Sequence, residues 1–340
     1  MNKDRVIDDV KRMFDDPAQV AERLREQPES YEVTPTEDAV IAAARQQRHE
    51  AVGDGISGLD KVAEGREEDI TEDERFGMEA IILLTGRPAI FVQDGDFLTP
   101  PAEWNLLNDQ RAAICAALGR VGRVEVRGHL DLDWVGTAWL GGPDTAVTNR
   151  HVAIEFSQAD GGRWSFRPGM SSRLDLREEM GSVAPLEFEV TGVIGVHEQH
   201  DLALLRVEAT SPDGQALPDP LPVAATAPDS VVGQQIYTVG YPAWDGRRNE
   251  PEPMRRIFMD VYNVKRLQPG QTTGLAQDRP ALRHDCSTLG GNSGSPVISL
   301  DDHRVIGLHF GGRYGIGNYA VPLWTLTDDP LLRAGAVNFQ

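Results

Sequence analysis

Three residues of this chain have the types and surroundings that nucleophilic catalysis requires. Ser293 lies in the segment GGNSGSP at positions 290–296, just before the strand-like run 297–300. Glycines allow the turn that exposes such a hydroxyl, and the N–H groups of Gly291 and Ser293 could both point at one oxyanion. The alternative is an ordinary Gly/Ser/Asn turn between two strands, so the interpretation depends on a base and an acid elsewhere.

His151 and Asp201 supply the matching base and acid. His151 lies in TNRHVA at positions 148–153, and Asp201 lies in HDLALL at positions 200–205, where an apolar strand begins. Taken alone, His151 could be a structural histidine, and Asp201 could be an aspartate at the start of a strand. Together they fit a triad in which His151 takes the proton of Ser293 and Asp201 fixes the imidazole tautomer. The three residues predict acyl transfer, with Ser293 as the nucleophile.

The elements around these residues change character along the chain. From Pro88 onward, short apolar runs alternate with Gly/Pro/Asp turns, which favours an antiparallel barrel or sandwich, apart from a short helix predicted over 108–118. Before that point the apolar residues recur at helical spacing. Helix starts are predicted at Asp16-Pro17, at Thr34–Glu37 (with a helix running to about Glu50) and at Thr71–Glu74.

Composition limits the classes of partner. The 340 residues carry a net charge of −20, which would repel nucleic acid and anionic membranes, so neither is an expected partner. The two cysteines, Cys115 and Cys286, fit no metal-binding spacing, and the N-terminus has no signal-peptide pattern. His197, His200 and Asp201 lack a suitably spaced fourth ligand. We therefore expect a cytoplasmic protein with no metal and no cofactor.

The segments TNRHV, DLALL and GNSGSP resemble those of chymotrypsin-fold (trypsin-like) serine peptidases. The similarity is greatest to bacterial V8-like glutamyl endopeptidases and HtrA-like proteases, and it covers about residues 88–332. It implies two six-stranded antiparallel β-barrels, with His151 and Asp201 on the first barrel and Ser293 on the second. Asn292 stands where digestive enzymes carry an aspartate that pairs with a newly cut N-terminus, so that mode of activation is not expected here.

The resemblance also suggests a primary specificity pocket. Its base maps onto Ser287, where trypsin-type enzymes carry an aspartate, so a preference for basic residues before the scissile bond (P1) is not expected. Thr288 and His309 match positions that V8-like enzymes use to bind glutamate. A hydroxyl and a partly protonated imidazole could both donate hydrogen bonds to a carboxylate, which predicts an acidic P1 residue. The alternative is that Thr288 and His309 only line a small polar pocket.

The sequence thus predicts a mainly β serine endopeptidase domain over 86–340, preceded by an α-helical domain over 1–85. Its partners would be protein or peptide substrates, and a regulatory protein docking on the N-terminal helices. Helical modules joined to trypsin-like domains resemble bacterial effector architectures, so recruitment or autoinhibition is the expected role of 1–85. The alternatives are a catalytically silent protease-fold module that binds proteins, and an esterase of the same fold.

Overall fold

The computed structural model describes residues 6–8, 10–11, 14, 16–26, 52–82, 86–244, 258, 261–277, 279–313 and 317–340. The chain forms two compact units, which are described separately. The first consists of Met1–Pro88, Pro101–Trp104 and Gly246–Val261, and the second consists of Ala89–Pro100, Asn105–Asp245 and Tyr262–Gln340. Within the described residues, no helix is both long enough and apolar enough to cross a membrane.

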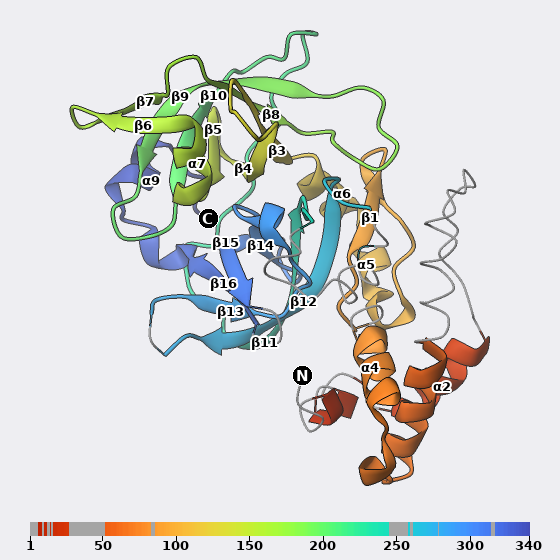
Figure 1. Cartoon of the computed structure of the whole chain (residues 1–340). Helices are drawn as coiled ribbons and strands as arrows, with labels where there is room; N and C mark the ends of the chain where they lie inside the picture. Colours follow the sequence, from red (N-terminus) through yellow and green to blue (C-terminus); the bar gives the residue numbers. More distant parts are fainter. Residues whose placement is uncertain are drawn as a thin grey trace. The chain divides into compact units, whose positions relative to one another are not determined.

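The first half of the second unit is a closed barrel of six antiparallel strands, in the order β10-β5-β4-β3-β8-β9 (Figure 1). Its strands are β3 (Val121–Arg127), β4 (Trp134–Gly142), β5 (Thr145–Thr148), β8 (Ser171–Asp175), β9 (Glu187–Val196) and β10 (Ala203–Val207). Inward-facing side chains such as Val124, Leu140, Phe188 and Leu205 fill the barrel. Burying these apolar surfaces is the main force that holds the barrel closed.

The second half adds six more antiparallel strands that also close on one another (Figure 1). They are β11 (Val232–Gly240), β12 (Arg266–Leu275), β13 (Leu282–His284), β14 (Pro296–Ser299), β15 (Val305–Arg313) and β16 (Gly317–Pro322). The ring closes because β11 pairs with both β12 and β14. The short strands β1 (Ile90–Gln93) and β2 (Asp96–Phe97) extend the sheet beyond β12. The two six-stranded antiparallel barrels implied by the resemblance are confirmed.

Short helices and a hairpin connect or follow the barrel strands. Helix α7 (Arg150–Phe156) follows β5, and the hairpin of β6 (Ser157–Asp160) and β7 (Arg163–Phe166) follows α7. Gly161 and Gly162 form the two-residue hairpin loop, and both have positive φ, which suits the twist of a tight antiparallel turn. Near the C-terminus, α9 (Pro330–Ala334) begins at the N-cap Asp329.

The predicted helix over 108–118 is divided in the structure. The short helix α5 (Leu106–Asp109) ends first, and α6 (Arg111–Leu118) begins two residues later. Gln110 separates them with φ −102 and ψ 7, and its N–H bonds the carbonyls of α5 instead of continuing one helix. The prediction was therefore right about helical structure but wrong about its continuity.

The first unit has a small apolar core of its own. Val6, Val10 and Phe14, which gave the helical spacing in the sequence, are buried with residues such as Leu59 and Met78. Helix α2 (Pro17–Glu26) begins where predicted, with Asp16 Oδ1 accepting hydrogen bonds from the N–H groups of residues 18 and 19. The helix predicted from Thr34 to about Glu50 lies outside the described residues.

The capping box predicted at Thr71–Glu74 is present at the start of α4 (Glu72–Ile81). Glu74 accepts a hydrogen bond from the Thr71 N–H at 2.9 Å, and the Glu74 N–H donates to Thr71 Oγ1 at 3.2 Å. Burial by itself would raise the pKa of Glu74. Hydrogen bonds from Lys61, Ser57 and the Thr71 N–H outweigh that effect and lower the pKa to about 2. Glu74 is therefore ionised near neutral pH and stabilises the start of the helix.

Candidate active site

Helix α7 presents His151 at its first turn. Val152, Ala153 and Phe156 on the same helix are buried in the first barrel, which fixes the helix on its apolar side. The His151 side chain lies away from that core and is 46% exposed. The packing of α7 thus leaves the imidazole exposed while the apolar side of the helix is buried.

Asp201 lies in the loop between β9 and β10 and contacts His151 twice. The His151 N–H donates to Asp201 Oδ1 at 3.0 Å, and His151 Nδ1 lies 2.6 Å from Asp201 Oδ2. Burial tends to raise the pKa of Asp201, but the hydrogen bonds and charge of His151, together with the charge of Arg150, lower it below its ordinary value. Asp201 is therefore a carboxylate that accepts the Nδ1 proton, which leaves the lone pair of neutral His151 on Nε2.

Ser293 follows the 3₁₀ turn Gly290–Asn292 and precedes β14, and it remains 9% exposed. Gly294 has φ +93°, and a Cβ there would lie 2.0 Å from the Thr137 carbonyl oxygen, so the position requires glycine. The Thr137 N–H donates to the Ser293 carbonyl at 2.9 Å, and Thr137 Oγ1 donates to the Gly291 carbonyl at 2.8 Å. Strand β4 of the first barrel therefore holds the serine turn of the second.

The two expected oxyanion donors, the N–H groups of Gly291 and Ser293, lie in this turn, and that of Ser293 is engaged within it. The Ser293 N–H donates to the Gly290 carbonyl at 3.2 Å within the 3₁₀ turn, so it is not directed at a substrate oxygen. At Gly291, a Cβ would lie 2.1 Å from the Tyr241 carbonyl oxygen and 2.3 Å from Trp134. Only glycine fits at 291, while a Cβ at Gly290 would meet nothing within 4 Å. Within this turn, open space thus surrounds Gly290, whereas Gly291 is tightly enclosed.

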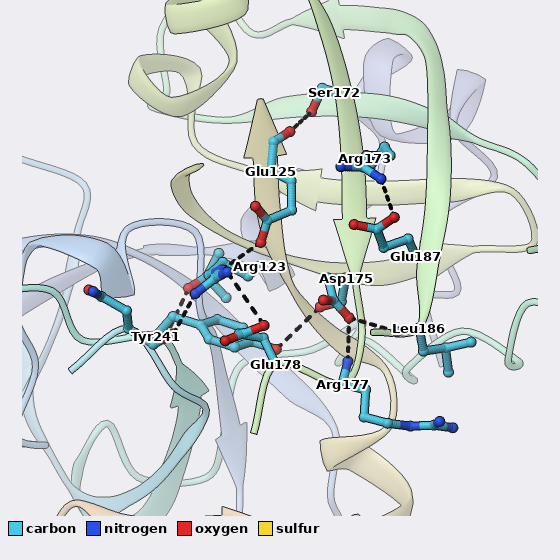
Figure 2. Close-up of polar contacts among 12 residues, drawn as sticks. Arg123, Glu125, Ser172, Arg173, Asp175, Arg177, Glu178, Leu186, Glu187 and Tyr241 are labelled. Carbon is cyan, nitrogen blue, oxygen red and sulfur yellow. Dashed lines mark hydrogen bonds and ion pairs between the residues drawn. The ribbon is translucent and has the colours of Figure 1, made fainter. Parts of the chain in front are cut away.

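Near Trp134, Arg123 forms ion pairs with two carboxylates; Figure 2 shows Arg123, Glu125 and Glu178 together with Tyr241. Arg123 donates to Glu125 at 2.6 Å, lies 3.5 Å from Glu178, and places its guanidinium 5.3 Å from the Trp134 ring centre. Burial, and also the neighbouring carboxylates, raise the pKa of Glu125 and of Glu178. Arg123 thus packs over the Trp134 ring, while the Tyr241 hydroxyl is held separately, donating to the carbonyls of Val121 and Asp175 at 3.4 Å.

Of the expected pocket residues, His309 lies on β15 directly beside the serine turn. Its N–H donates to the Ser295 carbonyl at 2.9 Å, and its own carbonyl accepts from the Gly294 N–H at 2.9 Å. The ring is buried, with Nδ1 3.1 Å from His284 Nε2. Burial, reinforced by His284 and His151, lowers the pKa of His309 well below its ordinary value. The partial protonation expected from the sequence therefore does not fit: His309 is neutral at neutral pH.

The other pocket residues are engaged within the protein. Thr288 Oγ1 donates to Asn318 Oδ1 at 2.8 Å, and Asn318 Nδ2 donates to the Cys286 carbonyl at 2.6 Å. Ser287 is buried, and its carbonyl accepts a hydrogen bond from Gln268. In this structure, the hydroxyl proton of Thr288 is therefore committed to Asn318, a residue that the sequence analysis did not identify.

His284 is a second residue that the sequence analysis did not identify. Burial lowers the pKa of His284 to about 4, so it too is neutral at neutral pH. Strands β13 and β15 both pair with β16, where His284 is opposite Asn318 and His309 is opposite Ala320. Only this register brings the two histidines together, and no local motif indicates it.

The chain is similar to known serine proteases. Residues 136–308 match the family model described as a trypsin-like peptidase domain. A probable serine protease from Lysobacter enzymogenes is 31% identical over 323 residues, which cover 85% of this chain and 83% of that protein. A glutamyl endopeptidase from Staphylococcus epidermidis is 26% identical over 180 residues, which cover 52% of this chain and 54% of that protein.

Among solved structures, the serine endoprotease from Yersinia pestis aligns with a TM-score of 0.45 and 17% identity, over 66% of this chain and 66% of its own. The family match covers half of the chain, including parts of both barrels, and the Lysobacter relative spans most of this chain. On these grounds, the chain belongs to the family of trypsin-like serine peptidases.

Proposed function

We propose that the protein is a serine endopeptidase that works through an acyl-enzyme on Ser293. The observation that carries the proposal is the double contact of His151 with Asp201, at 3.0 Å through the backbone and 2.6 Å through the ring. This contact fixes both the orientation and the tautomer of the imidazole. The free Nε2 lone pair is then the general base that a serine hydroxyl needs.

The reaction would follow from these roles. As Ser293 Oγ attacks the peptide carbonyl, His151 Nε2 takes the hydroxyl proton and the carbonyl oxygen becomes an oxyanion. The imidazolium is stabilised by the Asp201 carboxylate, and it donates its proton to the leaving amine when the C–N bond breaks. A water molecule then attacks the acyl-enzyme with the same base, which releases the carboxylic acid and restores Ser293.

The oxyanion requires donors that the turn does not yet offer, because the Ser293 N–H is bonded to the Gly290 carbonyl. We propose that the peptide joining Gly290 and Gly291 rotates when a substrate binds. Such a rotation changes ψ of Gly290 and φ of Gly291 together, and glycine at both positions keeps its cost low. The turn described here is then a resting conformation, and binding selects the active one.

A catalytically silent module that binds proteins is the second candidate. The observation that favours it is the same hydrogen bond between the Ser293 N–H and the Gly290 carbonyl. A scaffold, however, would gain nothing from an exposed histidine whose orientation and tautomer are fixed by a carboxylate. The peptidase is therefore the better supported function, and covalent labelling of Ser293, described in the Discussion, separates the two.

We further propose that the enzyme prefers glutamate at P1. The neutral pair of histidines supports this: if His284 Nε2–H donates to His309 Nδ1, then His309 Nε2–H remains free to donate to a carboxylate. The staphylococcal relative is named a glutamyl endopeptidase, which agrees with this preference. Thr288 could bind the P1 carboxylate only after breaking its hydrogen bond with Asn318. We therefore propose His309 as the principal residue that recognises this carboxylate.

A panel of peptides that differ only at P1 tests this preference. We expect kcat/KM for Glu to exceed that for the isosteric Gln by about ten- to a hundredfold, the value of a hydrogen bond to a charged group. In His309→Phe, which keeps a ring but lacks the N–H, the Glu/Gln ratio should fall towards one. Best cleavage after Leu, Phe or Arg would contradict the acidic preference without affecting the peptidase assignment.

For residues 1–85 we propose recruitment or autoinhibition. What supports this is a helical segment with an apolar core of its own and no catalytic constellation in its sequence. A chain that begins near residue 86 should hydrolyse peptides faster than the full chain if the segment inhibits. If the segment instead recruits protein substrates, the shortened chain should lose activity on proteins but keep its activity on peptides. Equal activity on both substrate types, together with no partner bound by 1–85, would exclude the regulatory role.

A further inference from the structure

The segment that carries His151 also holds the loop that carries Asp201. Arg150 Nη2 donates to the carbonyl oxygens of His197 and, at 2.7 Å, of His200. Asn149 occupies the N-cap position of α7, but its side chain does not cap the helix; Nδ2 donates instead to the Asp201 carbonyl at 2.8 Å. The loop that carries Asp201 is thus hydrogen-bonded to Asn149 and Arg150, the two residues immediately before His151.

On its other side, the loop is attached to the C-terminal helix through His197. His197 Nδ1 accepts hydrogen bonds from the N–H groups of Gln199 and His200, both at 3.0 Å, so this nitrogen carries no proton. The proton is therefore on Nε2, which lies 3.1 Å from Asp329 Oδ2. A single neutral tautomer both closes the loop turn and links it to Asp329.

Asp329 is itself held in place by α9. Its other oxygen, Oδ1, accepts from the N–H groups of Leu331 and Leu332 at 2.9 and 3.2 Å, which caps the helix. Leu332 is buried, so the helix that carries this cap is anchored. The chain of contacts runs from a packed helix through Asp329 and His197 to the loop that ends at Asp201.

We propose that Arg150 and His197 are positioning residues that hold Asp201 against His151. The proposal rests on the peptidase function proposed above. Neither side chain touches the reacting atoms; both act on the backbone of residues 197–200. The Asp201 carboxylate must meet two donors of His151 at once, and misplacement of a catalytic group by about 1 Å can cost on the order of a hundredfold in rate. Fixing the loop from two sides provides that accuracy.

The test compares Arg150→Met with wild type in the full chain, with active sites counted by burst titration. We expect kcat per titrated site to fall by about tenfold or more, with KM within about twofold, because the loop moves while the substrate contacts remain. Arg150→Lys, which can still reach one carbonyl, should recover part of the loss. Arg206→Met, which removes an exposed ion pair with Asp144 on the same barrel, is the matched control and should leave kcat unchanged.

A second variant keeps the test decisive if Arg150→Met does not fold. Asp329→Asn retains an oxygen for the Leu331 and Leu332 N–H groups but sets an NH₂ group against His197 Nε2–H, so it breaks the link while preserving the cap. We expect kcat per site to fall here as well, with thermal stability close to that of wild type. The proposal would be overturned if Asp329→Asn kept the wild-type kcat per site. It would also be overturned if Arg150→Met kept that value and differed from wild type only in the number of sites titrated. Wild type that shows no burst would instead contradict the peptidase function.

Discussion

Replacing Ser293 with alanine is expected to lower kcat for peptide hydrolysis by a factor on the order of a million. Without the hydroxyl, no acyl-enzyme forms, and hydrolysis falls to what substrate binding and polarisation alone provide. The measurement is a chromatographic peptide assay with enough enzyme to detect slow turnover.

Ser295→Ala is the matched control for this substitution. Ser295 lies two residues further along the same turn, and its buried hydroxyl has no protein hydrogen-bond partner among the described residues, so its removal leaves no group unpaired. It should therefore keep nearly full activity. An equal loss in both variants, or activity retained in Ser293→Ala, would contradict the assignment of Ser293 as nucleophile.

Replacing Asp201 with asparagine is expected to lower kcat by about ten thousandfold. Both carboxylate oxygens accept hydrogen bonds from His151, one from its N–H and one from Nδ1. An asparagine offers one acceptor and one donor. If its oxygen keeps the backbone N–H, its NH₂ group faces Nδ1 and forces the proton onto Nε2, where His151 can no longer act as a base.

The measurement is kcat at neutral pH, with the fold checked by thermal melting. Asp160→Asn serves as the control, because Asp160 is an exposed residue of the β6–β7 hairpin. It should behave as wild type. A loss of less than about tenfold in Asp201→Asn would mean that the tautomer of His151 does not depend on this contact.

How much the sequence predicts depends on how local each feature is. The triad could be found because each member lies in a short recognisable segment, and the capping box at Thr71 and Glu74 because its two hydrogen bonds span three residues. The two barrels followed from the resemblance carried by those same segments. The contact between His284 and His309 could not be predicted, because it depends on the register of three strands.

Two further features could not be predicted from local sequence patterns, for other physical reasons. Glycines at 290 and 291 permit several backbone conformations of similar energy, so their sequence cannot show that the Ser293 N–H bonds the Gly290 carbonyl. Arg150 reads as a solvated side chain, and its role depends on loop carbonyls 47 and 50 residues away. The sequence therefore indicated the family and the candidate residues, whereas the conformation and the supporting contacts could not be predicted from it.

Labelling with a fluorophosphonate probe, followed by mass mapping of the adduct, tests the central claim most directly. The probe forms a covalent bond only with a serine activated by a base, so it reports the His151–Asp201–Ser293 arrangement without requiring knowledge of the substrate. The account predicts one adduct on Ser293 in wild type and none in Ser293→Ala. No labelling of wild type, or equal labelling of Ser293→Ala, would contradict it.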